Sequence, residues 1–182
     1  FQNTYEGVGR TNDGGETWEV LGGASVGLPE IGANMDAGGI IASTVDPLRA
    51  WTLVGGDLYR TDNGGDAWTL TTSSIGDGWF AFTPDESALF VSGVDAVYRS
   101  LDGINFSSID GPGESGRLAM GSDGAVYLAS HSGTGREGNG LWRYTDNVGW
   151  VGVLTPDTAI SEELENAAEF ITGVAVNPVD PS

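Results

Sequence analysis

The chain has 182 residues and a formal net charge of −19, because 26 acidic residues are set against seven arginines and no lysine. Such a charge repels phosphate groups, which argues against nucleic-acid binding and against anionic membranes. The absence of cysteine excludes a disulfide framework or a thiolate metal site, and no apolar run is long enough to span a bilayer. Thirty glycines favour many short strands joined by tight turns.

The same order of four short segments, here called A to D, recurs along the chain. A period of two and many β-branched residues predict strands in these segments. Three A segments run into turn signals such as Asp46-Pro47, and each C segment ends in an arginine. In chain order we expect strands within 1–10 and at 19–21, then at 40–45, 50–54, 58–60 and 69–71, then at 79–83, 88–91, 97–99 and 107–109, then at 117–120, 125–129, 141–143 and 151–154, and finally at 171–176.

A glycine-rich motif separates segments C and D in each unit. We call its copies box 1 (10–18), box 2 (60–68), box 3 (99–106) and box 4 (143–150). Boxes 1 and 2 are almost identical, whereas boxes 3 and 4 are weaker. Four short antiparallel strands in a repeat of about 40–50 residues are typical of a β-propeller blade. The sequence therefore predicts an all-β propeller of four-stranded antiparallel blades, about four blades' worth.

We expect residues 1–182 to form a single propeller segment. The units are 1–21, 40–71, 79–109 and 117–154, with 171–182 beginning another blade. The chain opens in segment B and closes in segment A, so either its ends share a blade or it is part of a larger propeller. We favour the larger propeller, because blades otherwise leave unpaired edges. The start at Phe1, without methionine, also suggests a processed or excerpted chain.

The box pattern Ser/Thr-x-Asp-x-Gly-x-x-Trp resembles the Asp-box, or bacterial neuraminidase repeat. The matching positions are Thr11, Asp13, Gly15 and Trp18, then Thr61, Asn63, Gly65 and Trp68, then Ser100, Asp102 and Phe106, and finally Asp146 and Trp150. The resemblance implies a propeller with boxes in its C–D turns. Such boxes occur in sialidases, xyloglucan-active glycoside hydrolases, sortilin-type receptors and photosystem-assembly factors, so they imply a fold without one function.

The box residues have a structural role that needs no ligand. A carboxylate or hydroxyl oxygen satisfies the backbone donors of the turn, glycine supplies a positive φ, and the tryptophan packs between strands. The alternative is calcium binding by 13–16 or 62–66, although an oxygen cage needs more ligands than one such loop offers. We therefore expect no cofactor, with calcium left open.

Long insertions at 22–39, 131–140 and 154–170 all fall on the face opposite the boxes. Loops on a rigid scaffold carry function, so this face is the predicted binding surface. The third insertion is expected to hold a short helix that begins after Ser161. The candidate binding residues are Asn34, Asp36, His131, Arg136, Glu137 and Asp157.

A catalytic reading needs two carboxylates about 5–10 Å apart across a sugar, for which Asp36 and Glu30 are the alternative candidates. The sialidase resemblance would imply an arginine triad on the substrate. Only Arg117 and Arg136 stand outside the repeat positions and the A–B turn, and two arginines cannot form it.

The leading hypothesis is a non-catalytic, secreted or periplasmic propeller that serves as a binding or assembly scaffold for a protein or glycan. One alternative is a fragment of a xyloglucanase-like glycoside hydrolase that uses carboxylates on the long-loop face. Another is a cation-binding surface or appendage protein. We expect neither nucleic-acid binding nor membrane insertion, and we expect contacts with further blades of the same or another chain.

Overall fold

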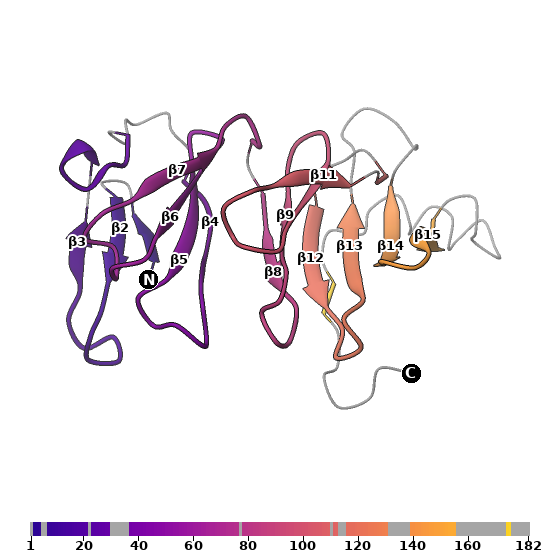
Figure 1. The fold of residues 1–182 in the computed structure, drawn as a ribbon, viewed down its shortest axis with the longest axis horizontal. Helices are drawn as coiled ribbons and strands as arrows, with labels where there is room; N and C mark the ends of the chain where they lie inside the picture. Colours follow the sequence, from indigo (N-terminus) through magenta and orange to yellow (C-terminus); the bar gives the residue numbers. More distant parts are fainter. Residues whose placement is uncertain are drawn as a thin grey trace. The chain divides into compact units, whose positions relative to one another are not determined.

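The computed structural model describes residues 2–4, 7–21, 23–29, 37–76, 78–109, 111–112, 116–130, 139–155 and 174–175 (Figure 1). The chain divides into two compact units, which are described one at a time. Unit 1 comprises Phe1–Asp77 together with Gly103–Phe106, and unit 2 comprises Gly78–Asp102 together with Ser107–Ser182.

Unit 1 contains two antiparallel sheets, which we call blades 1 and 2. Blade 1 has three strands, which hold the places of segments B, C and D, and blade 2 has four. Blade 1 consists of β1 (Gln2–Thr4), β2 (Gly7–Arg10) and β3 (Glu19–Leu21). After the short 3₁₀ helix η1 (Gly23–Val26), blade 2 consists of β4 (Ala37–Ala42), β5 (Ala50–Val54), β6 (Asp57–Thr61) and β7 (Thr69–Thr72).

Unit 2 contains blades 3 and 4, each a four-stranded antiparallel meander in chain order. Blade 3 consists of β8 (Phe80–Phe82), β9 (Leu89–Ser92), β10 (Val97–Ser100) and β11 (Ser107–Ile109). Blade 4 consists of β12 (Gly116–Met120), β13 (Val126–Ser130), β14 (Gly140–Thr145) and β15 (Gly149–Leu154). The predicted all-β architecture of four-stranded antiparallel blades is confirmed.

Most strand boundaries lie within a few residues of the predicted ones, and the differences have local causes. Strand β4 starts at Ala37, because a register shift between Ala37 and Ile40 carries the strand through two glycines that break the alternating pattern. Strand β14 starts at Gly140, the last residue of a predicted insertion. Of the expected strand 171–176 only 174–175 are described, and the expected helix after Ser161 lies outside the described residues.

The second strand of each four-stranded blade is the most buried. All five residues of β5 and all four of β9 are buried, since inner strands of a blade are packed on both faces. One core cluster in unit 1 contains Val8, Leu28, Ala50, Val54, Tyr59 and Trp68. A cluster in unit 2 contains Ala88, Phe90, Val97, Val126 and Leu128. Burial of each such large apolar side chain contributes about 1.5–3 kcal/mol.

Part of the first insertion differs from its predicted role as a binding loop. The backbone N–H of Trp68 donates a hydrogen bond of 2.7 Å to the carbonyl oxygen of Val26. Leu28 is 2% exposed and belongs to the same core cluster as Trp68. Segment 23–28 therefore covers the tryptophan of box 2, because burying its apolar side chains stabilises the fold more than exposing them.

Two ends of each blade can now be distinguished. The A–B and C–D connections lie at one end, which we call the turn end, and the B–C connections lie at the other, the loop end. In unit 2 the turn end includes 83–88, 121–125 and 146–148, and the loop end includes 93–96. Residues 131–138, between β13 and β14 in the sequence, lie outside the described part of the chain.

Candidate functional site

Box 1 is held together by the side chains of Thr11 and Asp13. The Thr11 hydroxyl accepts a hydrogen bond from Gly15 N–H at 2.8 Å and donates to Asp13 Oδ1 at 2.7 Å. Asp13 Oδ1 also accepts the backbone N–H of Thr17 at 3.0 Å, and Asp13 Oδ2 accepts its hydroxyl. Gly15 has a φ of 100°, a conformation that a side chain would strain.

Box 2 repeats this arrangement with an amide in place of the carboxylate. The Thr61 hydroxyl accepts the N–H of Gly65 at 2.9 Å and donates to Asn63 Oδ1 at 2.9 Å. The same amide oxygen accepts the N–H of Ala67 at 2.9 Å. One side-chain oxygen at this position is therefore enough to close the turn, which explains why aspartate and asparagine both occur there.

Boxes 3 and 4 depart from this geometry to different degrees. Box 3 has the bond from hydroxyl to carboxylate seen in box 1: the Ser100 hydroxyl donates to Asp102 Oδ1 at 3.0 Å. Box 4 is a short hairpin, in which Val148 N–H donates to Thr145 O at 3.1 Å. Tyr144 stands where the other boxes have a hydroxyl residue, and its ring packs against Trp150 with centroids 5.2 Å apart.

The burial of the box tryptophans also varies. Trp68 is 4% exposed, whereas Trp18 is 48% exposed. The prediction that each box tryptophan packs between strands therefore does not describe Trp18. The reason is that segment 23–28 of the preceding blade connection covers Trp68, whereas the described residues include no such cover over Trp18.

The carboxylates of Asp13 and Asp62 already have hydrogen-bond partners in the fold. Hydrogen bonds from Thr17 hold the pKa of Asp13 well below its usual range. Burial raises the pKa of Asp62, but hydrogen bonds from Arg60 and Arg49 outweigh it and lower the pKa overall. Across the residues that the structure describes, no group of three or more His, Cys, Asp or Glu side chains is arranged to hold a metal ion.

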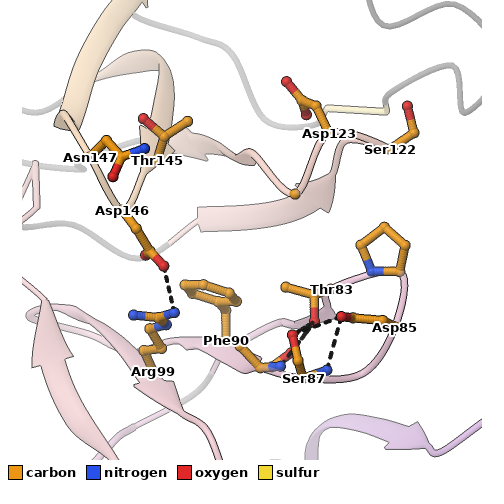
Figure 2. Close-up of a pocket in the computed structure, with 13 residues that line it drawn as sticks. Thr83, Asp85, Ser87, Phe90, Arg99, Ser122, Asp123, Thr145, Asp146 and Asn147 are labelled. Carbon is orange, nitrogen blue, oxygen red and sulfur yellow. Dashed lines mark hydrogen bonds and ion pairs between the residues drawn. The ribbon is translucent and has the colours of Figure 1, made fainter.

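A polar pocket of about 590 Å³ lies at the turn end of unit 2 (Figure 2). Its walls come from the A–B turns of blades 3 and 4 and from the hairpin of box 4. The lining residues are Thr83, Pro84, Asp85, Ser87, Ala88, Phe90, Arg99, Ser122, Asp123, Gly124, Thr145, Asp146 and Asn147. The pocket lies on the face opposite the predicted binding surface.

Each carboxylate of this pocket already has partners in the fold. Asp146 accepts a hydrogen bond of 2.7 Å from Arg99 Nη2, as Figure 2 shows. Hydrogen bonds from the hydroxyl and backbone N–H of Ser87 lower the pKa of Asp85 to about 2. The N–H of Ala125 and the guanidinium of Arg143 lower the pKa of Asp123. These groups stabilise the turns, so the pocket is a polar groove whose carboxylates are already hydrogen-bonded within the fold.

At the loop end of unit 2, Trp79 forms a different kind of surface. Its indole is 46% exposed, and the guanidinium carbon of Arg117 lies 4.3 Å from the ring centroid. The backbone N–H of Trp79 donates to Ser92 Oγ at 2.9 Å, and the Ser92 hydroxyl donates to Gly116 O at 2.6 Å. These bonds connect the ends of β8, β9 and β12 next to Trp79.

The sequence pattern places Trp79 at the start of a strand and therefore does not predict it as a site residue. The signal that could have identified it is a tryptophan directly after a D–A connection, on the predicted binding face. All seven predicted site residues lie outside the described part of the chain: Glu30, Asn34, Asp36, His131, Arg136, Glu137 and Asp157. Their roles stay predictions.

No protein-family model matches the sequence, and no curated protein matches it. Solved structures do resemble it. An ancestral GH74 enzyme matches with a TM-score of 0.64 and 17% identity over 84% of this chain and 22% of its own. The GH74 enzyme of Niastella koreensis matches with a TM-score of 0.61 and 19% identity over 90% of this chain and 23% of its own. The GH74 xyloglucanase of Xanthomonas campestris matches with a TM-score of 0.59 and 21% identity over 87% of this chain and 22% of its own.

These similarities show the fold. The chain consists of β-propeller blades and spans less than a quarter of the length of the solved structures it matches. A segment of a larger propeller fits this coverage. None of the described residues belongs to a helix long and apolar enough to cross a membrane.

Proposed function

We propose that the chain is a non-catalytic propeller module that binds a glycan at the loop end of unit 2. The observation that supports this most directly is the half-exposed indole of Trp79 with Arg117 against its ring. The position is consistent with the predicted binding face. The Asp-box resemblance and the acidic composition motivate a secreted or periplasmic location.

The chemistry of this surface suits a sugar. A pyranose ring has apolar C–H faces and a rim of hydroxyl groups, so it packs flat on an indole while its rim stays hydrogen-bonded. Arg117 has guanidinium N–H groups that can donate to the hydroxyl oxygens. The hydrogen bond from Trp79 N–H to Ser92 Oγ positions the backbone, and Arg117 packs on the indole, so the surface is partly ordered before a ligand arrives, which lowers the entropic cost of binding.

Xyloglucan is the first glycan to test, because one of the matched GH74 structures is a xyloglucanase. Titration calorimetry with xyloglucan oligosaccharides would measure binding to the 182-residue chain. Trp79→Ala should abolish binding, and Arg117→Ala should weaken it. Trp18→Ala is the matched control, since Trp18 is similarly exposed but lies next to a box turn in unit 1. Equal affinity of the wild type and Trp79→Ala would overturn the assignment of the site.

The glycoside hydrolase reading is the second candidate, and the similarity to GH74 enzymes over 84–90% of the chain motivates it. It assigns the reaction to Asp36 and Glu30. Release of reducing ends from xyloglucan by the wild type, lost in Asp36→Asn, would replace the binding module with this function. Hydrolysis that survives Asp36→Asn would remove Asp36 from the proposal.

The third reading, a cation-binding surface or appendage protein, predicts a dependence on calcium. Melting of the chain in calcium and in excess chelator would test it. An unchanged melting temperature would count against the cation, whereas a clear rise in calcium would favour this reading over the glycan module.

A further inference from the structure

Three blades repeat one cross-strand contact between their second and third strands. In each, the arginine that opens the box lies directly opposite an aromatic residue, and its guanidinium covers that ring. The pairs are Trp51 with Arg60 at 5.5 Å, Phe90 with Arg99 at 5.7 Å, and Tyr127 with Arg143 at 6.0 Å. We call these the aromatic–arginine pairs.

In blades 2 and 3 the box of the next blade in the sequence contacts this pair. The indole N–H of Trp51 donates to the carbonyl oxygen of Gly103, in box 3, at 2.7 Å. Arg99 donates to Asp146, in box 4, at 2.7 Å. Trp51 and Phe90 are only 3% and 2% exposed. The aromatic–arginine pair of one blade is therefore the contact surface for the box of the next blade.

The guanidinium of Arg10 in blade 1 forms hydrogen bonds with its own blade and with the box of blade 2. Its Nη2 donates to Glu19 of its own blade at 2.8 Å. Its Nη1 donates to the carbonyl oxygen of Gly64 and to the carboxylate of Asp66, both at 2.7 Å and both in box 2. One nitrogen thus binds within the blade, and the other binds the next box.

Arg143 of blade 4 makes contacts within its own blade, as Arg10 does. Its Nη2 donates to Asp123 at 2.9 Å, and its Nε donates to the Tyr127 hydroxyl at 3.2 Å. Within the described part of the chain its Nη1 makes no hydrogen bond. The Arg143 side chain is 38% exposed, compared with 18% for Arg10 and 26% for Arg99. Among the described residues, no box therefore contacts the Tyr127–Arg143 pair.

Box 1 is the complementary surface. Residues 12–20 are all exposed. The Cβ position of Gly14 has no atom within 4 Å, whereas that of its counterpart Gly64 meets Arg10 Nη1 at 3.6 Å. Glu16 occupies the place of Asp66, and within the described part of the chain it forms no ion pair. Box 1 therefore presents the acceptors that box 2 offers to Arg10.

We propose that the Tyr127–Arg143 pair binds box 1 of a second copy of this chain, head to tail. Arg143 Nη1 donates to the carbonyl oxygen of Gly14 and to the carboxylate of Glu16 of that copy, as Arg10 does to Gly64 and Asp66. The contact is heterologous, since the two copies contribute different surfaces. It places a positive group against an acidic turn, although each copy carries a net charge of −19.

Sedimentation velocity of the 182-residue chain in about 0.15 M salt, which screens the overall repulsion, tests this contact. We expect the wild type to form species of at least twice the 18.8 kDa monomer mass as concentration rises. Arg143→Glu and Glu16→Arg should each reduce the chain to a monomer. Mixing these two variants should restore association, because the intact Arg143 of one meets the intact Glu16 of the other. Arg49→Glu makes the same charge change in the A–B turn of blade 2, outside both contact surfaces, and should associate like the wild type.

A folding control distinguishes loss of the contact between copies from loss of folding. Circular dichroism should show the same folded spectrum for all variants at a concentration where the chain is monomeric. The melting temperature of Arg143→Glu should be lower than that of the wild type, because this variant loses the ion pair with Asp123. A wild-type chain that is monomeric at every concentration overturns the proposal. So does association that survives Arg143→Glu, or two folded variants that stay monomeric when mixed.

Discussion

The indole Nε1 of Trp51 donates a hydrogen bond of 2.7 Å to the carbonyl oxygen of Gly103, which lies 52 residues further along the chain. Trp51 belongs to β5, in the interior of blade 2, and Gly103 belongs to the turn of box 3. Gly103 has a φ of 67°, and a Cβ built on it would overlap the Trp51 ring. The glycine of box 3 is thus required both by its backbone conformation and by an aromatic ring from another part of the sequence.

Gly103→Ala should destabilise the protein more than the same change at Gly124. Gly124 also has a positive φ, of 78°, but its Cβ position has no atom within 4 Å. Both changes strain the backbone, and only Gly103→Ala also forces Trp51 to move. We expect the free energy of unfolding to fall by about 1–3 kcal/mol more at Gly103, measured by urea denaturation. Equal losses of unfolding free energy would mean that the Trp51 side chain moves aside without destabilising the protein.

Asp13→Asn should preserve box 1, whereas Asp13→Ala should lower the melting temperature clearly. The reason is that Asn63 makes the corresponding bonds in box 2 with a single amide oxygen. Differential scanning calorimetry of the two variants at neutral pH measures the difference. Similar melting temperatures for both variants would contradict the structural role of this oxygen.

The wild type and Asp13→Asn should differ in the pH dependence of their stability. Hydrogen bonds from Thr17 lower the pKa of Asp13 in the folded state. The stability that the carboxylate contributes is therefore fully present above the unfolded-state pKa of about 3.9, and it is lost as pH falls through the lower folded-state pKa. Between about pH 5 and pH 2 the wild type should lose more stability than Asp13→Asn. Parallel profiles of melting temperature against pH would rule this contribution out.

Phe90→Ala should destabilise unit 2 by about 3–5 kcal/mol. The Phe90 ring is 2% exposed, belongs to a core cluster and makes an edge contact with Tyr144 at 6.2 Å. Leu101→Ala is the control, because Leu101 is 69% exposed and its removal should change stability by less than about 0.5 kcal/mol. Chemical denaturation of both variants measures these values. A small loss at Phe90 would mean that this core rearranges to fill the cavity.

The ion pair between Arg99 and Asp146 should have a coupling energy of only about 0.2–1 kcal/mol, because both side chains are partly exposed. Arg99→Ala should nevertheless cost more than Asp146→Ala, since it also uncovers the Phe90 ring. A double-mutant cycle with Arg99→Ala and Asp146→Ala, followed by denaturation, separates these contributions. A coupling energy of several kcal/mol would show that the pair is far better shielded from water than its exposure indicates.

The box repeats carried most of the information about fold. Hydrogen bonds between Thr11 and Asp13, or between Thr61 and Asn63, connect residues two positions apart, so the motif specifies its turn locally. The alternating strands between the boxes specify the four-stranded blades in the same local way. By contrast, the sequence alone did not single out Trp79 or the turn-end pocket, because their surroundings come from several strands and turns.

The sequence by itself determined the all-β blades, their order of strands and the position of each box turn, because period-two patterning and short-range hydrogen bonds act within a few residues. Only the tertiary structure decided which box is buried and which is exposed. Trp68 and Trp18 occupy the same place in their boxes, but segment 23–28 covers Trp68 alone. It also decided that Arg10 reaches Gly64 and Asp66, since contacts across more than 50 residues depend on how blades pack and leave no periodic trace in the sequence.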